Sequence, residues 1–245
     1  ICKLSRNLYS PGRSDDRSDV HSQHGKIVPE LSSGNEVIAK AEIVQYIENL
    51  GAKTSSPGGG AVAAVTGAQS IGLIEMVCQF TPENENENEN KSETTIASMV
   101  QRTKILAPKM LALGDDDVVC FEALMASYKL PKSTTSEKSE RTQSIQVCLA
   151  AAATVPLNII KIINGVIPDI QYLADYGNPN LITDVAIAAS LGQSALTSSQ
   201  LNVLINLKQI RDQTFRVQAL GVLDSIPANL LLLQNIIDEI TEQLN

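Results

Sequence analysis

Residues 61–80 read AVAAVTGAQSIGLIEMVCQF, a nearly unbroken run of small and apolar residues with a single charge at Glu75. A helix that is apolar on every side is a buried helix. We therefore expect this segment to form the central helix of the fold. Directly before it stands SSPGGG, residues 55–60, which is typical of a turn.

Helical periodicity continues on both sides of this run. Apolar residues recur three or four positions apart, as on one face of a helix. The segments with this pattern are residues 36–50, 92–125, 136–176, 183–211 and 214–244. No strand with a period of two residues stands out, so the predicted class is all-α, a bundle of long, partly kinked helices. Aromatic residues make up only 3% of the chain, and small aliphatic side chains favour close helix packing.

Breaks and caps divide the predicted helices. Thr134 and Glu137 fit a capping box at the start of one helix, and Gly177-Asn178-Pro179-Asn180 is a strong turn signal. Four residues inside the predicted helices are expected to bend or interrupt them: Pro108, Gly114, Pro156 and Pro168.

Two polar segments flank or interrupt the helical region. Residues 1–35 are rich in Ser, Arg, Asp, Gly and His, a composition that cannot repay the entropy of ordering, so we expect a flexible extension. Residues 36–245 are predicted to form one helical domain. Within it, residues 81–91 hold an Asn-Glu repeat without apolar members, which predicts an inserted, solvent-exposed loop.

Charge and composition exclude several classes of protein. The net charge is −8 and no basic stripe occurs, which disfavours a nucleic-acid partner. No run of about 18 apolar residues lacks a charge or a turn residue, so no membrane span is expected. No signal peptide is recognisable at the start. The four cysteines match neither a CxxC motif nor a disulfide framework, which favours buried thiols in the cytoplasm: Cys2, Cys78, Cys120 and Cys148.

The candidate chemistry does not rest on histidine, because His21 and His24 both lie in the polar extension. Instead, the glycines of residues 55–60 expose backbone N–H groups beside the positive end of a helix. They could cradle an anion or a carbonyl oxygen, or merely allow a tight turn. A branched side chain at Gly59 is expected to block such a cradle.

Several other polar residues are candidates for a site, each with a purely structural alternative. Asp115, Asp116 and Asp117 point in three directions around a helix, so at most one or two can face a cleft; a solvated helix start is the alternative. Lys132 and Arg141 could receive a carboxylate or lie at the surface. The remaining candidates are Asn178, Asp184, Asn202 and Asn206. The last two share one helix face, where they could bind a ligand or join helices.

The order of several motifs closely resembles one family, the cyclodeaminase domain of formimidoyltransferase-cyclodeaminase and its stand-alone relatives, which include methenyltetrahydrofolate cyclohydrolases. The resemblance covers about residues 42–212. It is carried by SSPGGGAVAAVTGA, IEMVCQFT, DDDVVCFEALMASYKLPK, GNPNLITDVAIAA and LNVLINLKQIRD. The chain departs from the family at Ala61, where Ser is frequent, and in its Asn-Glu repeat. No formimidoyltransferase domain is expected before residue 36.

The resemblance implies a helical homodimer that binds a tetrahydrofolate derivative between helices, without a metal or a further cofactor. It implies cyclodeaminase activity, which forms 5,10-methenyltetrahydrofolate and ammonia from 5-formimidoyltetrahydrofolate. The alternatives are cyclohydrolase activity and a folate-binding relative without turnover. The family's D-x-x-x-F motif aligns with Asp117 to Phe121, which implies Asp117 as the acid-base residue, with Asp115 as the fallback. The implied substrate-binding residues are Ser56, Pro57, Gly58, Gly59, Gly60, Lys132, Arg141, Asn178, Asp184, Asn202 and Asn206.

Overall fold

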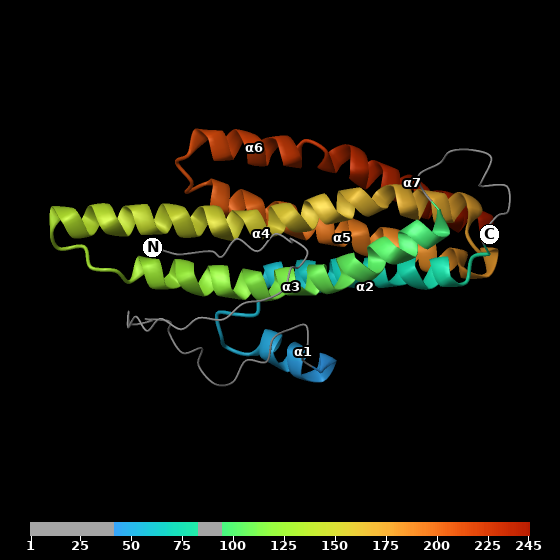
Figure 1. Cartoon of the computed structure of the whole chain (residues 1–245), viewed down its shortest axis with the longest axis horizontal. Helices are drawn as coiled ribbons and strands as arrows, with labels where there is room; N and C mark the ends of the chain where they lie inside the picture. Colours follow the sequence, from blue (N-terminus) through green and yellow to red (C-terminus); the bar gives the residue numbers. More distant parts are fainter. Residues whose placement is uncertain (1–41, 83–94) are drawn as a thin grey trace, which may run out of the picture. The chain divides into compact units, whose positions relative to one another are not determined.

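A computed structural model describes residues 42–82 and 95–245 of the chain, and these residues form helices joined by short turns (Figure 1). The elements are α1 (Ile43–Gly51), α2 (Gly59–Gln79), α3 (Ile96–Tyr128), α4 (Thr135–Tyr176), the 3-10 helix η2 (Pro179–Leu181), α5 (Ile182–Leu207), α6 (Gln213–Leu223) and α7 (Ile226–Gln243). No strand occurs within the described ranges, so the predicted all-α class is confirmed. The predicted extension, 1–35, and most of the predicted loop, 81–91, lie outside the described residues.

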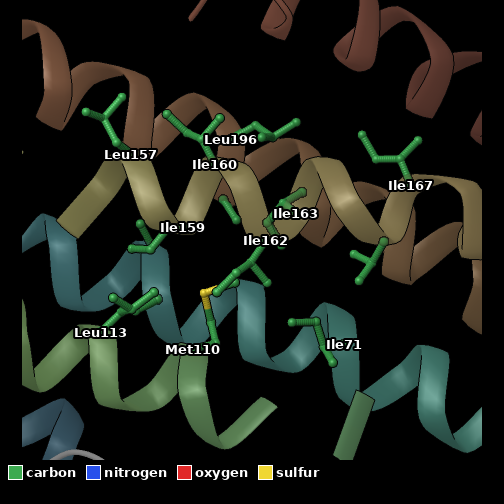
Figure 2. Close-up of a cluster of buried hydrophobic side chains, with 14 of the residues drawn as sticks. Ile71, Met110, Leu113, Leu157, Ile159, Ile160, Ile162, Ile163, Ile167 and Leu196 are labelled. Atoms are coloured by element: carbon green, nitrogen blue, oxygen red, sulfur yellow. The ribbon is translucent and has the colours of Figure 1, made fainter. Parts of the chain in front are cut away.

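Helix α2 is the buried centre that its composition predicts. It packs against α3, α4 and α5, and α4 in turn packs against α5. Figure 2 shows Ile71 of α2, Met110 of α3 and Ile162 of α4 gathered between their helices. A Cβ atom at Gly67 of α2 would lie 3.0 Å from Met110 Cε and 3.2 Å from Ile163 Cδ1. A small residue is therefore needed there for the close approach of the three helices.

Two polar contacts join the core helices. The buried Ser70 hydroxyl of α2 donates a hydrogen bond to the Ala188 carbonyl of α5, at 2.8 Å. The Arg102 guanidinium of α3 pairs with both carboxylate oxygens of Asp169 on α4, a side chain that is only 1% exposed. The buried charge is thus paired and hydrogen-bonded, as an apolar interior requires.

Helices α3 and α4 run without a break, whereas the sequence analysis allowed interruptions at Pro108, Gly114, Pro156 and Pro168. A proline inside a helix costs about 3 kcal/mol. Around Pro156, the side chains of Ile159, Ile160 and Ile163 are fully buried, and burial of each such side chain stabilises the fold by about 1.5–3 kcal/mol. Packing on the neighbouring helices therefore outweighs the local cost.

The predicted last helix, 214–244, is instead two helices, α6 and α7. Pro227 is near the start of α7 and has no N–H group to continue the hydrogen bonding of α6. Ser225 stabilises the turn, because its hydroxyl donates to the Val222 carbonyl at 2.8 Å and accepts from Nδ2 of Asn164 on α4 at 2.9 Å. The predicted capping box at the start of α4, formed by Thr134 and Glu137, is present.

Three helical segments are long and apolar enough to cross a membrane by length and composition alone: α2, α4 and residues 213–243. Each of the three contains charged or turn residues, such as Gly72 and Glu75 in α2, so none is the uninterrupted apolar run that was absent from the sequence. In α2 and α4, 56% of the most apolar window is buried inside the protein, but only 22% is buried in residues 213–243. The apolar character of α2 and α4 is accounted for by their place in the helical core.

Candidate functional site

A cavity of about 420 Å³ opens where the start of α2 meets α3 and α5. This volume is within the range of small-molecule sites in proteins. The polar part of its lining consists of Ser55, Ser56, Gly58, Gly59, Gly60, Asp117, Asn202, Asn206 and Gln209. The remaining lining residues are Phe121, Leu124, Met125, Tyr128, Ala152 and Ile205. The lining thus combines polar groups, which can orient a ligand, with apolar side chains, which can cover it.

One face of α3 forms a long wall of this cavity. Asp117, Phe121, Leu124 and Tyr128 follow one another at intervals of four, three and four residues, so they lie on the same side of the helix. Asp117 and Tyr128 are 11 residues apart, which corresponds to about 16 Å along the helix axis. The cavity therefore has a carboxylate at one end and a phenol at the other.

The Asp117 carboxylate lies against the first turn of α2. It accepts a backbone hydrogen bond from Ala61, and a Cβ atom at Gly60 would overlap with the carboxylate group. Burial raises the pKa of Asp117, and the Ala61 hydrogen bond lowers it without cancelling the effect of burial. A carboxylate of this kind can both take and return a proton nearer neutral pH than an exposed aspartate can.

The neighbouring aspartates do not line the cavity. Asp116 is exposed, and its pKa is raised by desolvation and by the negative charge of Asp115. Asp115, the fallback for the acid-base role, is half-buried outside the cavity. The geometry thus favours Asp117 over Asp115 as the acid-base candidate.

Asn202 and Asn206 of α5 face the cavity and also bond within their own helix. Nδ2 of Asn202 donates to the Ser198 carbonyl at 3.0 Å, and Nδ2 of Asn206 donates to the Asn202 carbonyl at 2.9 Å. These bonds satisfy one donor of each amide and leave its carbonyl oxygen as an acceptor for a ligand. The Asn202 amide lies 3.8 Å from a Cβ atom built on Gly59. The turn into α2 therefore has Asn202 beside Gly59 and Asp117 beside Gly60.

Two of the predicted binding residues lie at the other end of α2. The Asn178 backbone N–H donates to Thr81 Oγ1 at 3.1 Å, and its Nδ2 donates to the Phe80 carbonyl at 2.8 Å. Asp184 lies in the first turn of α5, which follows directly. Since α2 is 21 residues long, these residues are about 30 Å from the glycine turn. The structure does not bring Asn178 and Asp184 together with Asp117.

Three more of the predicted residues do not line the cavity: Pro57, Lys132 and Arg141. Lys132 is exposed in the turn between α3 and α4. Arg141 instead caps the end of α3, because its Nε and Nη2 donate to the Tyr128 carbonyl at 3.3 Å and 3.1 Å. Its guanidinium thus binds the end of the helix that carries Tyr128.

Among the lining residues that were not predicted from the sequence are Tyr128 and Gln209, which contact each other. The Tyr128 hydroxyl donates to Oε1 of Gln209 at 2.8 Å, so α3 and the segment after α5 meet at this end of the cavity. Tyr128 could have been found from its spacing along the face of α3 that begins at Asp117. Gln209 had no such signal, because only the tertiary fold brings it to Tyr128.

Residues 42–82 and 95–245 hold no group of three or more His, Cys, Asp or Glu side chains that could bind a metal ion. His21 and His24 lie outside these ranges. Cys78 is buried beside Met99, with Sγ and Sδ 3.7 Å apart. Burial raises the pKa of Cys78 to about 12, so its thiol is a poor nucleophile.

Comparison with known proteins relates the chain to one family. The sequence model of the family described as formiminotransferase-cyclodeaminase matches residues 42–224. The methenyltetrahydrofolate cyclohydrolase of Methylorubrum extorquens is 32% identical over 196 residues, which are 80% of this chain and 91% of the relative. The formimidoyltransferase-cyclodeaminase of Rattus norvegicus is 30% identical over 190 residues, which are 78% of this chain but only 35% of the relative.

A solved structure supports the same relationship. The crystal structure of formiminotetrahydrofolate cyclodeaminase from Thermotoga maritima matches with a TM-score of 0.72 and 28% identity. The match covers 84% of this chain and 98% of the other. The helical arrangement is therefore shared over nearly the whole of that protein.

Proposed function

Because this chain belongs to the formiminotransferase-cyclodeaminase family, we propose that its cavity binds a tetrahydrofolate derivative and that Asp117 transfers the proton in a cyclodeaminase reaction. The observation that carries the proposal is the half-buried Asp117 carboxylate. It lies against the first turn of α2, in a cavity that Asn202 also lines. A homodimer and a cytoplasmic location, both implied by the sequence, remain predictions.

The ring closure needs one proton to move between two nitrogen atoms. Nitrogen 10 of 5-formimidoyltetrahydrofolate attacks the carbon of the protonated formimidoyl group, and Asp117 accepts the proton that nitrogen 10 loses. The bond between that carbon and the terminal nitrogen then breaks, and Asp117 returns the proton to the departing nitrogen. The products are ammonia and the 5,10-methenyl cation, so atoms and charge balance. A single carboxylate of raised pKa is suited to both steps.

The other groups at this end of the cavity would hold the folate in place. The partial positive charge at the start of α2 favours the ionised form of Asp117 and so opposes the effect of burial on its pKa. The carbonyl oxygen of the Asn202 amide can accept a hydrogen bond from an N–H group of the ligand. Apolar side chains such as Phe121 and Met125 would pack against the aromatic rings of the folate and exclude water.

A second candidate is methenyltetrahydrofolate cyclohydrolase activity. It is favoured by the Methylorubrum extorquens relative, which the chain matches over 91% of that protein's length. In this reaction a water molecule adds to the methenyl carbon and Asp117 accepts its proton. Opening of the ring leaves 10-formyltetrahydrofolate, with one proton of the water on nitrogen 5 and one released. The same carboxylate serves both reactions.

An absorbance assay with both folates tests these proposals. We expect the purified chain to produce the methenyl chromophore from 5-formimidoyltetrahydrofolate if it is a cyclodeaminase, and to remove it from 5,10-methenyltetrahydrofolate if it is a cyclohydrolase. A chain that binds folate and changes neither signal would be a non-catalytic member of the family. Absence of turnover with both folates would refute the proposed function, whether or not the folate binds.

The pH dependence of the reaction should report the ionisation of Asp117. A base must be ionised to accept a proton, so kcat should fall as the pH decreases through the pKa of Asp117. Because burial raises that pKa, we expect the acidic limb of the profile at a higher pH than for an exposed aspartate, whose pKa is about 3.9. Measurement of kcat from pH 4 to 8, with buffers of constant ionic strength, checks this expectation. A flat profile in the acidic range would contradict it.

A further inference from the structure

The segment between α5 and α6 is held by one side chain of α4. Nε2 of Gln146 donates to the Gln209 carbonyl at 2.9 Å, and its Oε1 accepts from the backbone N–H of Arg211 at 2.7 Å. One carboxamide thus binds a backbone acceptor and a backbone donor two residues apart. Ile210, between them, is only 4% exposed and anchors the segment in the core. Gln146 itself does not line the cavity.

Gln209 connects the segment that Gln146 holds to the cavity. Its side-chain oxygen accepts the hydrogen bond of the Tyr128 hydroxyl at 2.8 Å, and both residues line the cavity. The Tyr128 proton is directed to Gln209, so its phenol oxygen can only accept a hydrogen bond from a ligand. The amide nitrogen of Gln209 can donate one. Tyr128 and Gln209 thus offer a ligand one hydrogen-bond acceptor and one donor. The positions of these two groups depend on the position of the backbone of residues 209–211.

We propose that Gln146 is a positioning residue for the substrate: it holds Gln209, and through Gln209 the Tyr128 hydroxyl, at the end of the cavity distant from Asp117. The proposal rests on the proposed function of the same cavity. Because Tyr128 is about 16 Å along α3 from Asp117, the pair binds a part of the folate away from the reacting carbon. Gln146 therefore controls affinity for the folate and leaves proton transfer at Asp117 unchanged.

The rest of the segment has other supports, so loss of Gln146 loosens it without unfolding it. The Arg216 guanidinium donates to the Leu207 carbonyl and, at 3.4 Å, to the Ile210 carbonyl. Together with the buried Ile210 side chain, this keeps the chain in place between α5 and α6. The expected consequence of removing the Gln146 amide is a wider range of positions for Gln209.

Steady-state kinetics of Gln146→Ala in the full chain tests the proposal, with the folate that the unmodified protein converts. We expect KM to rise about tenfold, the effect of losing a pair of positioned hydrogen bonds to the ligand. We expect kcat to stay within about threefold and the acidic limb of its pH profile to stay in place. Gln143→Ala is the matched control, because Gln143 is exposed on the same helix, one turn earlier, and should change neither constant.

A double-mutant cycle shows whether Gln146 acts through Tyr128. Tyr128→Phe should also raise KM, and the double variant should be no worse than the more affected single variant, because both changes disable the same pair. Additive effects, an unchanged KM in Gln146→Ala, or a loss confined to kcat would overturn the positioning role and leave the proposed function standing. An unmodified chain that converts neither folate would refute both.

Discussion

Replacement of Asp117 by asparagine is expected to lower kcat by about two to four orders of magnitude, the usual contribution of a positioned acid or base. The amide keeps the size of the side chain, and its oxygen can still accept the hydrogen bond from Ala61, but it cannot take a proton at any working pH. Folate affinity should change much less, because the lost interaction acts mainly in the transition state. Stopped-flow or steady-state absorbance of the methenyl chromophore measures the loss.

The control for this experiment is Asp116→Asn. Asp116 carries the same charge one residue earlier, but it is exposed and does not line the cavity, since adjacent helical residues point about 100° apart. Its activity should stay within about threefold of the unmodified chain. Equal losses in the two variants would indicate an effect of net charge or folding, and full activity of Asp117→Asn would exclude Asp117 as the proton carrier.

Gly60→Ala is expected to have the second largest effect, a loss of about a hundredfold in kcat. The new Cβ atom would occupy the space of the Asp117 carboxylate, so the carboxylate must move. A displacement of about 1 Å is enough to cost a factor of this size. The fold should survive, because alanine is favoured over glycine in a helix. The kcat of the purified variant measures the loss, and circular dichroism and thermal unfolding verify that α2 still forms.

Gly59→Ala separates this steric effect from the general effect of losing a glycine. Its Cβ atom would lie 3.8 Å from the Asn202 amide, an ordinary van der Waals contact, so activity should fall no more than about threefold. The sequence analysis pointed to Gly59 as the sensitive position for a branched side chain. The structure makes Gly60 the position where even one methyl group displaces the acid-base residue. Similar losses in both alanine variants would contradict this reading.

The fold could be predicted from local patterns wherever one pattern dominated. The run from Ala61 to Phe80 is apolar on every side, and only a buried helix fits that composition. Pro156 was expected to bend or interrupt its helix. The interruption is absent, because buried isoleucines on the same helix outweigh the cost of the proline. Conversely, Pro227 ends the continuity of the last helix, although the apolar period runs across it.

The parts of the site that could be predicted are those that lie close together in the sequence. The glycine turn starts the central helix, so residues 58–60 could be grouped, and Asn202 and Asn206 share one helix face. Asp117 was assigned to the site only through its resemblance to the family motif. Residue type alone could not show which end of a helix a polar residue reaches. Asn178 has the chemistry of a ligand contact but caps the far end of α2. Gln209 reaches Tyr128 only through contacts distant in sequence.

The role of Asp117 can be tested by a structure of the chain with a bound tetrahydrofolate derivative. We expect the folate in the cavity between the start of α2, α3 and α5, with nitrogen 10 or the one-carbon group within about 2.6–3.2 Å of an Asp117 carboxylate oxygen. The Asn202 amide should face the ligand from the other side. A folate bound elsewhere, for example beside Asn178 and Asp184 at the far end of α2, would contradict the claim and transfer the chemistry to other residues.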